Sequence, residues 1–290
     1  WEYTDATNWQ SGQPRDSRKY HNLAPTASLS FPIGNIKARL SYMRKTSRPT
    51  FGQLSSAIKY IDRYSYESGN PGLRPIYRDY ISASASWENL AIELEYCSTK
   101  NYFMWQTSEY PGNKDITLLT MVNMPKFSTY GAYINYTPTF FECWHPSIMA
   151  GINIQDFKIE HAGRVIILNR PLGIFRFDNA IHLPRNIWLN VDLSARTSGN
   201  GDNYYIKPHW QCNVGLYKSF VNDTWSIRLQ LNDVFDTWRQ GVTLYDAISC
   251  GSSKKIYDTR ELSLTIRCNF NSARSRYKGR GAGNNDKNRF

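Results

Sequence analysis

The stretch from Glu261 to Phe270 alternates between polar and apolar side chains without a break. Its apolar members are Leu262, Leu264, Ile266, Cys268 and Phe270. Neighbouring residues of a β-strand point to opposite faces, so this stretch is predicted to form a strand with one apolar and one polar face. The apolar face can meet the core of a soluble sandwich. It can equally meet lipid in a membrane barrel whose polar face lines a water-filled lumen.

Four pairs of neighbouring segments repeat this alternation and match each other across short turns. We predict the turns at residues 33–34, 88–89, 184–186 and 221–222. The predicted apolar cross-strand pairs are Phe31 with Ile36, Leu29 with Ala38, Trp87 with Leu90, Ala85 with Ile92, Ala83 with Leu94, Leu183 with Ile187, Ile181 with Leu189, Phe177 with Leu193, Leu216 with Ile227, Val214 with Leu229, and Cys212 with Leu231. A slip of one residue would place apolar side chains opposite polar ones in every hairpin.

The same pattern extends along most of the chain. We expect strands at residues 24–31, 35–46, 74–87, 90–106, 115–140, 144–160, 171–183, 186–198, 204–219, 223–235 and 255–271. The longer connections are expected at 47–73, 107–114, 161–170, 199–203 and 236–254. Residues 1–22 are polar and irregular, and we predict the end of a strand followed by a loop. Short turns that alternate with long connections are typical of outer-membrane barrels, whose short turns face the periplasm.

Composition excludes several other classes of protein. Mean hydropathy is −0.56, and no apolar run approaches the roughly 20 residues that a spanning helix needs. The five cysteines include no CxxC pair and the five histidines are scattered, so we expect no metal site and no cofactor. The chain begins with Trp1 and shows no export signal. We therefore expect either a mature chain or a fragment.

Aromatic side chains favour lipid over a soluble core as the partner of the apolar faces. Six of them lie within a few residues of a predicted short turn: Phe31, Trp87, Trp144, Phe220, Trp225 and Phe270. This arrangement is similar to the aromatic girdle at a membrane interface. The alternative, in which these rings cap the core of a large soluble sandwich, stays open on pattern alone.

Three motifs carry a family resemblance that covers nearly the whole chain from about residue 20. Residues 48–49 read R-P, and Gly69-Asn70-Pro71-Gly72-Leu73-Arg74-Pro75 follows further on. Residues 231–237 read L-N-D-V-F-D-T, and residues 277–284 read Y-K-G-R-G-A-G-N. Together and in this order they resemble the signatures of TonB-dependent receptors, and most of all the outer-membrane β-barrel family common in Bacteroidota.

The resemblance implies a location and a set of partners. Such receptors are barrels of about 22 strands with a plugged lumen, and their N-terminal TonB box engages an energy-transducing protein. This chain has about 11–12 predicted strands, so it resembles the C-terminal half, incomplete and open. The implied partners are outer-membrane lipid, the missing plug domain and N-terminal barrel half, the TonB system through that missing N-terminus, and a surface lipoprotein. The implied location is the bacterial outer membrane.

We expect two parts, a partial outer-membrane β-barrel over residues 1–271 and a basic, Gly-rich periplasmic tail over residues 272–290. The tail holds six basic residues and one acidic residue. For a periplasmic segment, anionic headgroups or solvation explain such charge better than nucleic acid does, so no nucleic-acid partner is expected.

Two groups of residues are candidate sites. Aromatic residues in or near the long connections could stack on a sugar or siderophore, or pack loop against loop: Tyr60, Tyr64, Tyr66, Trp105, Tyr110, Trp238 and Tyr245. A charge cluster of Arg176, Asp178 and Asp192 is predicted on the lumen wall. Paired carboxylates near His182 could serve a hydrolase. However, charged lumen walls are ordinary, so we interpret the cluster as structural and expect no enzyme.

The leading hypothesis is therefore the C-terminal barrel portion of a TonB-dependent receptor. Such a receptor would take up an unidentified ligand, for example a siderophore, a cobalamin-like compound or a glycan. The alternatives are a passive porin or surface-binding barrel, and a soluble carbohydrate-binding β-sandwich. Recovery in the soluble periplasm would contradict both barrel hypotheses.

Overall fold

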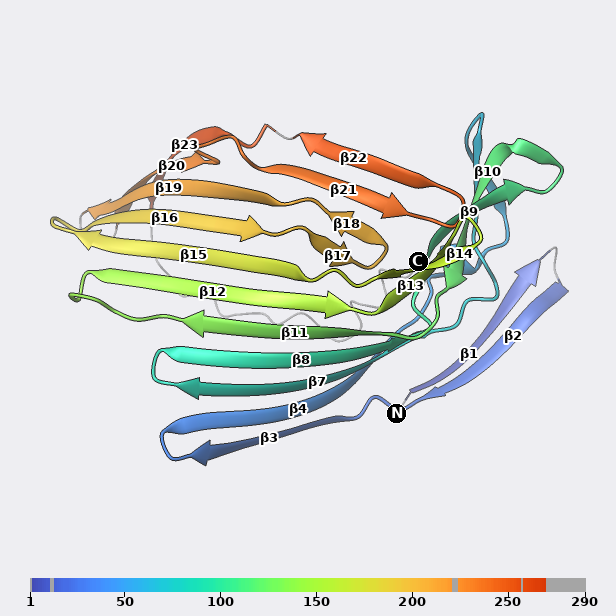
Figure 1. Ribbon diagram of the computed structural model, residues 1–290, viewed down its shortest axis with the longest axis horizontal. Coiled ribbons are helices and arrows are strands. Elements are labelled where there is room, and N and C mark those ends of the chain that lie inside the picture. Colours follow the sequence, from blue (N-terminus) through green and yellow to red (C-terminus); the bar gives the residue numbers. More distant parts are fainter. Residues whose placement is uncertain (1, 11–12, 221–223, 257, 270–290) are drawn as a thin grey trace.

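A single curved antiparallel sheet dominates the structure, a computed structural model that describes residues 2–10, 13–220, 224–256 and 258–269 (Figure 1). In spatial order it consists of β23 (Glu261–Cys268), β20 (Trp225–Asn232), β19 (His209–Phe220), β16 (Ile187–Arg196), β15 (Leu172–Leu183), β12 (Trp144–Gln155), β11 (Phe127–Tyr136), β8 (Leu90–Lys100), β7 (Ile76–Trp87), β4 (Ile36–Ser47) and β3 (Thr26–Ile33). We call these eleven strands the wall. The predicted all-β barrel portion is confirmed, and the wall is not closed, since β3 and β23 each pair on one side only among the described residues.

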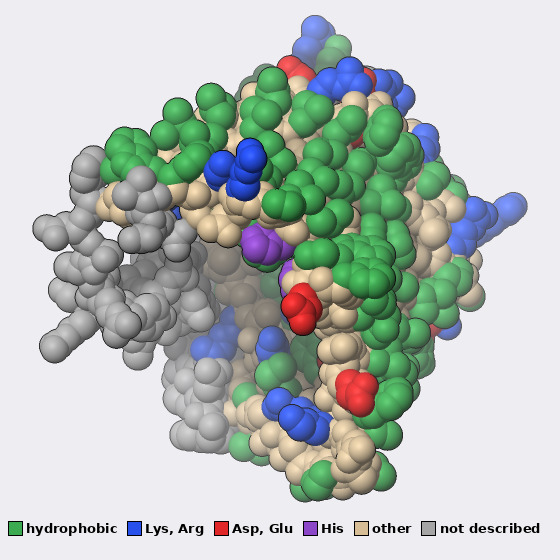
Figure 2. Space-filling view, turned by 90° about the vertical axis from the view of Figure 1, so that its left-hand side faces the viewer, with side chains coloured by type: hydrophobic (Ala, Val, Ile, Leu, Met, Phe, Trp, Pro, Cys, Tyr) green, Lys and Arg blue, Asp and Glu red, His purple; other side chains and the backbone are tan. Residues whose placement is uncertain are grey.

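The apolar residues of each wall strand form its outer face. In β23 the side chains of Leu262, Leu264 and Ile266 are 67%, 63% and 60% exposed. Exposed Leu, Ile and aromatic side chains continue across the neighbouring strands, and Figure 2 shows green side chains gathered along the upper and right-hand outside of the wall in this view. The face assignment made from the alternation is therefore right, and the wall has no apolar core of its own.

Two of the four predicted hairpins have the predicted register. The turn at 88–89 pairs Trp87 with Leu90, and the turn at 184–186 pairs Leu183 with Ile187. The other two predictions are wrong by two residues. Ile33 pairs with Ile36 across a Gly34-Asn35 turn, and Phe220 pairs with Trp225 across residues of which 221–223 lie outside the described part.

The error at the first hairpin has a simple cause. A two-residue hairpin turn needs positive φ angles, and Gly34 supplies one at +59°. The predicted turn residue Ile33 is β-branched and stays in the strand. Because the side-chain period of a strand is two residues, a shift by two keeps every apolar residue on the outer face.

The short-turn end of the wall is rich in exposed aromatic side chains. Trp87, Trp225 and Phe220 are among the exposed large hydrophobic residues, and Trp144 packs against Phe140 in a tilted arrangement with ring centroids 5.0 Å apart. Phe31 is half-buried there, and Phe270, the sixth predicted girdle residue, lies outside the described residues. The tail at 272–290 also lies outside them.

The other end of the wall carries a second layer of short sheets, which we call the loop layer (Figure 1). It comprises the hairpin β1 (Glu2–Gln10) and β2 (Gln13–Asn22), the sheet of β5 (Ile58–Asp62), β6 (Ser65–Ser68), β10 (Asn113–Asn123) and β9 (Phe103–Tyr110), the hairpin β13 (Phe157–His161) and β14 (Arg164–Leu168), and the sheet of β17 (Gly199–Gly201), β18 (Tyr204–Ile206), β21 (Arg239–Tyr245) and β22 (Cys250–Ile256). A single helical turn, α1 (Phe51–Leu54), is closed at its start by a capping box between Thr50 and Gln53. No helix in the described ranges is long and apolar enough to cross a bilayer.

The loop layer corrects several sequence predictions. Residues 2–10 and 13–22 pair as two strands rather than forming an irregular segment, and the connections at 107–114, 161–170, 199–203 and 236–254 contain strands. These strands pair with one another rather than with the wall. The last wall strand begins at Glu261 instead of residue 255, because residues 255–256 belong to β22.

Four long predicted strands are each broken where the wall meets the loop layer. The strand 90–106 breaks at residues 101–102, where Asn101 adopts a φ of +56°. The strands 115–140 and 204–219 break at Pro125 and Pro208, which have no N–H to donate to a neighbouring strand. The strand 144–160 breaks at Asp156. Alternation continues across these breaks, so the sequence pattern alone does not reveal them.

The hydrophobic core of the protein lies in the loop layer and at its junction with the wall. Its buried members are Met124, Phe127, Phe157, Ile159 and Leu168. The rings of Phe127 and Phe157 meet edge to face with centroids 4.9 Å apart. The loop layer is therefore folded around its own apolar centre, which fixes where its surface side chains lie.

Candidate functional site

The segment at residues 69–75 anchors the first part of the loop layer. Asn70 donates from its side-chain amide to the carbonyl of Met121 at 2.8 Å, and its side-chain oxygen accepts from the backbone of Gly72 at 2.7 Å. A Cβ on Gly69 would overlap the carbonyl oxygens of Gln53 and Ser55, so only glycine fits there. Leu73 is fully buried. This motif therefore shapes the loop layer by holding α1 against β10.

The second motif is organised by one fully buried carboxylate, Asp233. Its oxygens accept hydrogen bonds from the backbone N–H of Thr237 at 3.0 Å, the backbone N–H of Trp238 at 3.1 Å and the hydroxyl of Thr259 at 2.6 Å. Burial alone would raise the pKa of Asp233. The hydrogen bonds from Thr259, Thr237 and Trp238 outweigh it and hold the pKa below its ordinary value. Asp233 thus ties the turn after β20 to the segment before β23.

Asp246 joins parts of the loop layer that are distant in sequence, and sequence reasoning did not single it out. Its carboxylate accepts hydrogen bonds from the backbone N–H and the hydroxyl of Thr107 and from the backbone N–H of Ala247. His161 contacts its backbone oxygen with Nδ1 at 2.6 Å. The residue therefore links β9, the β13–β14 hairpin and the turn after β21. No local pattern reveals this, because Thr107 and Asp246 are 139 residues apart.

The predicted loop aromatics divide into separate environments. Tyr66 lies between Tyr60 and Tyr110, with ring centroids 5.9 Å and 5.0 Å away. Tyr60 and Tyr64 are 67% and 59% exposed. Three further predicted aromatics lie in other environments. Trp105 lines two pockets, Trp238 packs edge-on against His209 at 4.6 Å, and Tyr245 packs against the hydrophobic core.

A cavity of about 450 Å³, which we call the outer pocket, opens between β9–β10 and the sheet that contains β18 and β21. Most of its lining is aromatic or aliphatic: Tyr102, Phe103, Met104, Trp105, Leu119, Met121, Tyr204 and Leu244. Its polar lining includes Thr107, Asn203 and Asp246, which also hold the loop strands together. Both this volume and this mixture of apolar surface with a few polar groups are typical of small-molecule sites.

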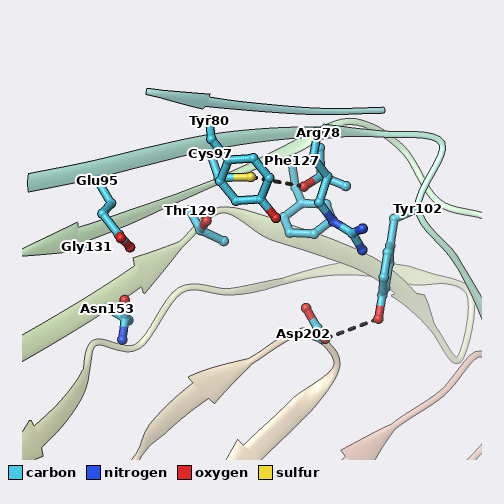
Figure 3. A pocket seen from close by; sticks show the side chains of 11 residues that line it. Arg78, Tyr80, Glu95, Cys97, Tyr102, Phe127, Thr129, Gly131, Asn153 and Asp202 are labelled. Atoms are coloured by element: carbon cyan, nitrogen blue, oxygen red, sulfur yellow. Dashed lines mark hydrogen bonds between the residues drawn. The ribbon is translucent and has the colours of Figure 1, made fainter. Parts of the chain in front are cut away.

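A second cavity of about 230 Å³, the inner pocket, lies on the polar face of β7, β8, β11 and β12 where these strands meet the loop layer. Arg78, Tyr80, Glu95 and Asp202 contribute its polar lining together with Tyr102, which also lines the outer pocket. Figure 3 shows Tyr102 and Asp202 closing one side of the inner pocket and Glu95 at the opposite side. The hydroxyl of Tyr102 donates to Asp202 at 3.1 Å. Burial, with the nearby Asp202 carboxylate, raises the pKa of Tyr102 to about 12.

The predicted charge cluster lies on the polar face of the wall as expected. Asp178 and Asp192 are direct cross-strand partners, and Arg176 is paired with Ser194. Arg176 lies outside ion-pair distance of either carboxylate within the described residues. His182 instead stacks on Trp188 at 4.6 Å. It is four residues from Asp178 on the same strand, about 13 Å away, so the carboxylates and this histidine form no catalytic arrangement.

The polar face of the wall surrounds a hollow. Seen from the short-turn end in Figure 2, basic and histidine side chains lie inside it, behind the apolar rim. Its lining includes Lys37, Arg39, Glu93 and Arg228, which alternate with the outward residues of their strands. No group of three or more potential metal ligands of the His, Cys, Asp or Glu type occurs among the residues that the structure describes.

Comparison with solved structures shows a known architecture. The siderophore receptor PirA from Pseudomonas aeruginosa superposes with a TM-score of 0.57 at 11% identity, over 76% of this chain and 39% of PirA. The ferric enterobactin receptor PfeA from the same organism, in complex with BCV-L6, gives 0.56 at 13% identity, over 84% of this chain and 38% of PfeA. The chain thus spans about two fifths of the length of these receptors. At this identity the likeness concerns the fold.

Sequence comparison assigns the family. No relative is found among curated proteins. The model of the outer membrane protein beta-barrel family, however, matches residues 1–270. With an outward apolar face, short turns at one end and a folded loop layer at the other, the protein resides in the bacterial outer membrane. The chain belongs to the outer membrane protein beta-barrel family.

Proposed function

We propose that this chain forms part of the barrel of a TonB-dependent receptor that captures a ligand in the loop layer and admits it to the lumen by energy-coupled transport. The observation that carries the proposal is the position of the two pockets. They meet at Tyr102, the outer among the loop strands and the inner on the polar face of the wall. A ligand held there lies at the entrance of the polar hollow, where a transporter must bind its cargo.

The direction of the edge strands indicates what completes the wall. All neighbouring wall strands are antiparallel, so the eleven strands leave β3 and β23 running the same way, towards the short turns. A second copy placed beside the first would therefore bring β23 against β3 in parallel. Bacterial barrels close with an even number of antiparallel strands, so antiparallel closure requires an odd number of further strands. An N-terminal barrel portion of the same receptor meets this condition.

The charges that line the polar hollow support the proposal that a plug domain is a further partner. Its lining carries charges of both signs, including Lys37, Arg39 and Glu93, which a polar plug surface can pair. The outer apolar face would contact lipid, and the exposed Tyr60 and Tyr64 rings offer a docking surface for a surface lipoprotein. We propose no catalytic activity, because the wall carboxylates and His182 are too far apart to act together.

Uptake by intact cells tests this proposal. Bacteria that produce the receptor would be offered a panel of labelled probes: ferric enterobactin, cobalamin, maltohexaose and leucyl-phenylalanine. We expect accumulation of at least one probe that depends on the protein and stops when a protonophore collapses the proton-motive force. Influx that continues after collapse would instead indicate a passive porin. Absence of any protein-dependent influx would contradict both transport functions.

A further inference from the structure

The inner pocket holds charged groups that have no ionic partner among the residues that the structure describes. The guanidinium of Arg78 reaches the hydroxyl of Ser47 only at 3.5 Å and lies 5.8 Å from the ring centre of Tyr102. Within the described ranges, no carboxylate is in ion-pair distance of Arg78, and no basic group is in ion-pair distance of Glu95 or Asp202. The inner pocket thus presents one cation and two anions, Arg78 and Glu95 from the wall and Asp202 from the loop layer, to whatever enters it.

Charge balance restricts the ligand. Among the residues that line the two pockets, the acidic Glu95, Asp202 and Asp246 outnumber the basic Arg78. The carboxylate of Asp246 already accepts hydrogen bonds from Thr107 and Ala247. We therefore assign it to holding the loop strands together rather than to binding a ligand. A ligand with several negative charges would meet unfavourable carboxylates. A ligand with one positive and one negative end can pair both kinds of group, and charge-assisted hydrogen bonds are the strong ones.

The outer pocket adds a requirement for apolar surface. Phe103, Met104 and Trp105 from β9 face it together with Leu119, Met121 and Leu244. An aliphatic or aromatic group that enters it removes apolar area from water on both sides. Because Tyr102 lines both pockets, one small molecule can place its charged ends in the inner pocket and its apolar group in the outer pocket.

We propose that the paired pockets bind short zwitterionic peptides with apolar side chains. Arg78 pairs with the C-terminal carboxylate, one of the two carboxylates on opposite sides of the pocket, Glu95 or Asp202, pairs with the N-terminal ammonium, and the apolar side chain fills the outer pocket. The identification of such a peptide as cargo rests on the proposed transport function, whereas the binding itself does not.

Calorimetric titration of the full chain in detergent micelles tests the assignment with leucyl-phenylalanine, its N-acetyl derivative and its C-terminal amide. The parent dipeptide is expected to bind about tenfold more tightly than either derivative, because each derivative loses one charge-assisted contact. Arg78→Gln should bind the acid and the amide equally. The double variant Glu95→Gln/Asp202→Asn should bind the free and acetylated amines equally. Arg39→Gln, on the polar face near the short turns, is the matched control and should change nothing.

Loss of discrimination, rather than loss of affinity alone, is the deciding result. Circular dichroism of each variant checks that its strand content matches that of the parent. Equal affinity of the unsubstituted chain for all three probes, or no binding at all, would overturn the proposal. So would an Arg78→Gln protein that still prefers the acid to the amide. Peptide binding without energised uptake would contradict only the transport function. Energised uptake of another probe without peptide binding would contradict only this assignment.

Discussion

The wall and the loop layer place their apolar side chains on opposite sides: the wall exposes them and the loop layer buries them. In the wall, Leu and Ile side chains point outward and stay exposed, as in β23. In the loop layer, Phe157, Ile159 and Leu168 point inward to a closed core. Alternation by two residues therefore does not by itself say where the apolar face lies, since that face is exposed on the outside of the wall and buried within protein in the loop layer. What distinguishes the regions is the medium that each apolar face contacts.

The largest expected effect is the loss of the loop-layer core. Phe157 is 1% exposed and packs on Phe127, so Phe157→Ala should destabilise the loop layer by about 3–5 kcal/mol. The wall should keep its structure, because of the buried core residues only Phe127, at the start of β11, belongs to a wall strand. Limited trypsin digestion should then cleave the β13–β14 hairpin at Lys158 or Arg164, while circular dichroism shows strand content retained.

The control for this variant lies on the same hairpin. Val165 is 70% exposed, and Val165→Ala should change stability by no more than about 0.5 kcal/mol. If Phe157→Ala also abolished the strand signal of the wall, the two regions would form one cooperative unit, and the separation argued above would be wrong.

The next largest effect is expected in the wall, where a charged substitution tests whether the outer face contacts lipid. Leu264 is exposed on the outer face and pairs with Leu229. Leu264→Arg should cost about 2–4 kcal/mol near the middle of the bilayer and should reduce recovery in the membrane fraction. Thr265→Arg, one residue along, points into the hollow and should leave recovery unchanged. Equal harm from both substitutions would refute the assignment of faces.

The sequence was informative about the wall for a physical reason. Lipid demands an unbroken apolar face, so every strand must display it, and the hairpins at residues 88–89 and 184–186 could be predicted in register. The same periodicity cannot distinguish a register from one shifted by two residues. The hairpins after Ile33 and Phe220 were therefore misplaced, although the glycine at position 34 was a usable signal for the first.

The loop layer and the pockets were harder to predict because their contacts join distant segments. The hydrogen bond from Tyr102 to Asp202 spans 100 residues, and neither residue belongs to a recognisable motif. Arg78 and Glu95 could be placed on the polar face by alternation, but nothing local shows that they share a pocket. The motif at residues 231–237 lies within the part of the chain that the family model matches, yet the role of Asp233 as a buried hydrogen-bond acceptor emerges only from the folded structure.

The smallest expected effect probes this carboxylate. In Asp233→Asn an amide nitrogen replaces one oxygen and faces N–H or O–H donors from Thr237, Trp238 and Thr259, so the loop turn should lose about 1–3 kcal/mol. Hydrogen exchange of the peptide at residues 233–245, corrected for intrinsic rates, measures the loss. Asp236→Asn is the control, because its ion pair with Arg239 is half exposed and is worth at most about 1 kcal/mol.

The effect of pH on Asp233 has a definite sign. The folded-state pKa of Asp233 is lower than its ordinary value of 3.8, so ionisation stabilises the fold above that value, and the contribution is lost as the pH falls through the lower folded-state pKa. Protection of the 233–245 peptide should therefore decrease below about pH 4 in the unsubstituted protein and should decrease less in Asp233→Asn. Equal acid sensitivity in the two proteins would mean that other carboxylates control this part of the loop layer. Because the loop layer depends on buried polar groups of this kind and the wall on its outward apolar face, acid should loosen the loop layer first.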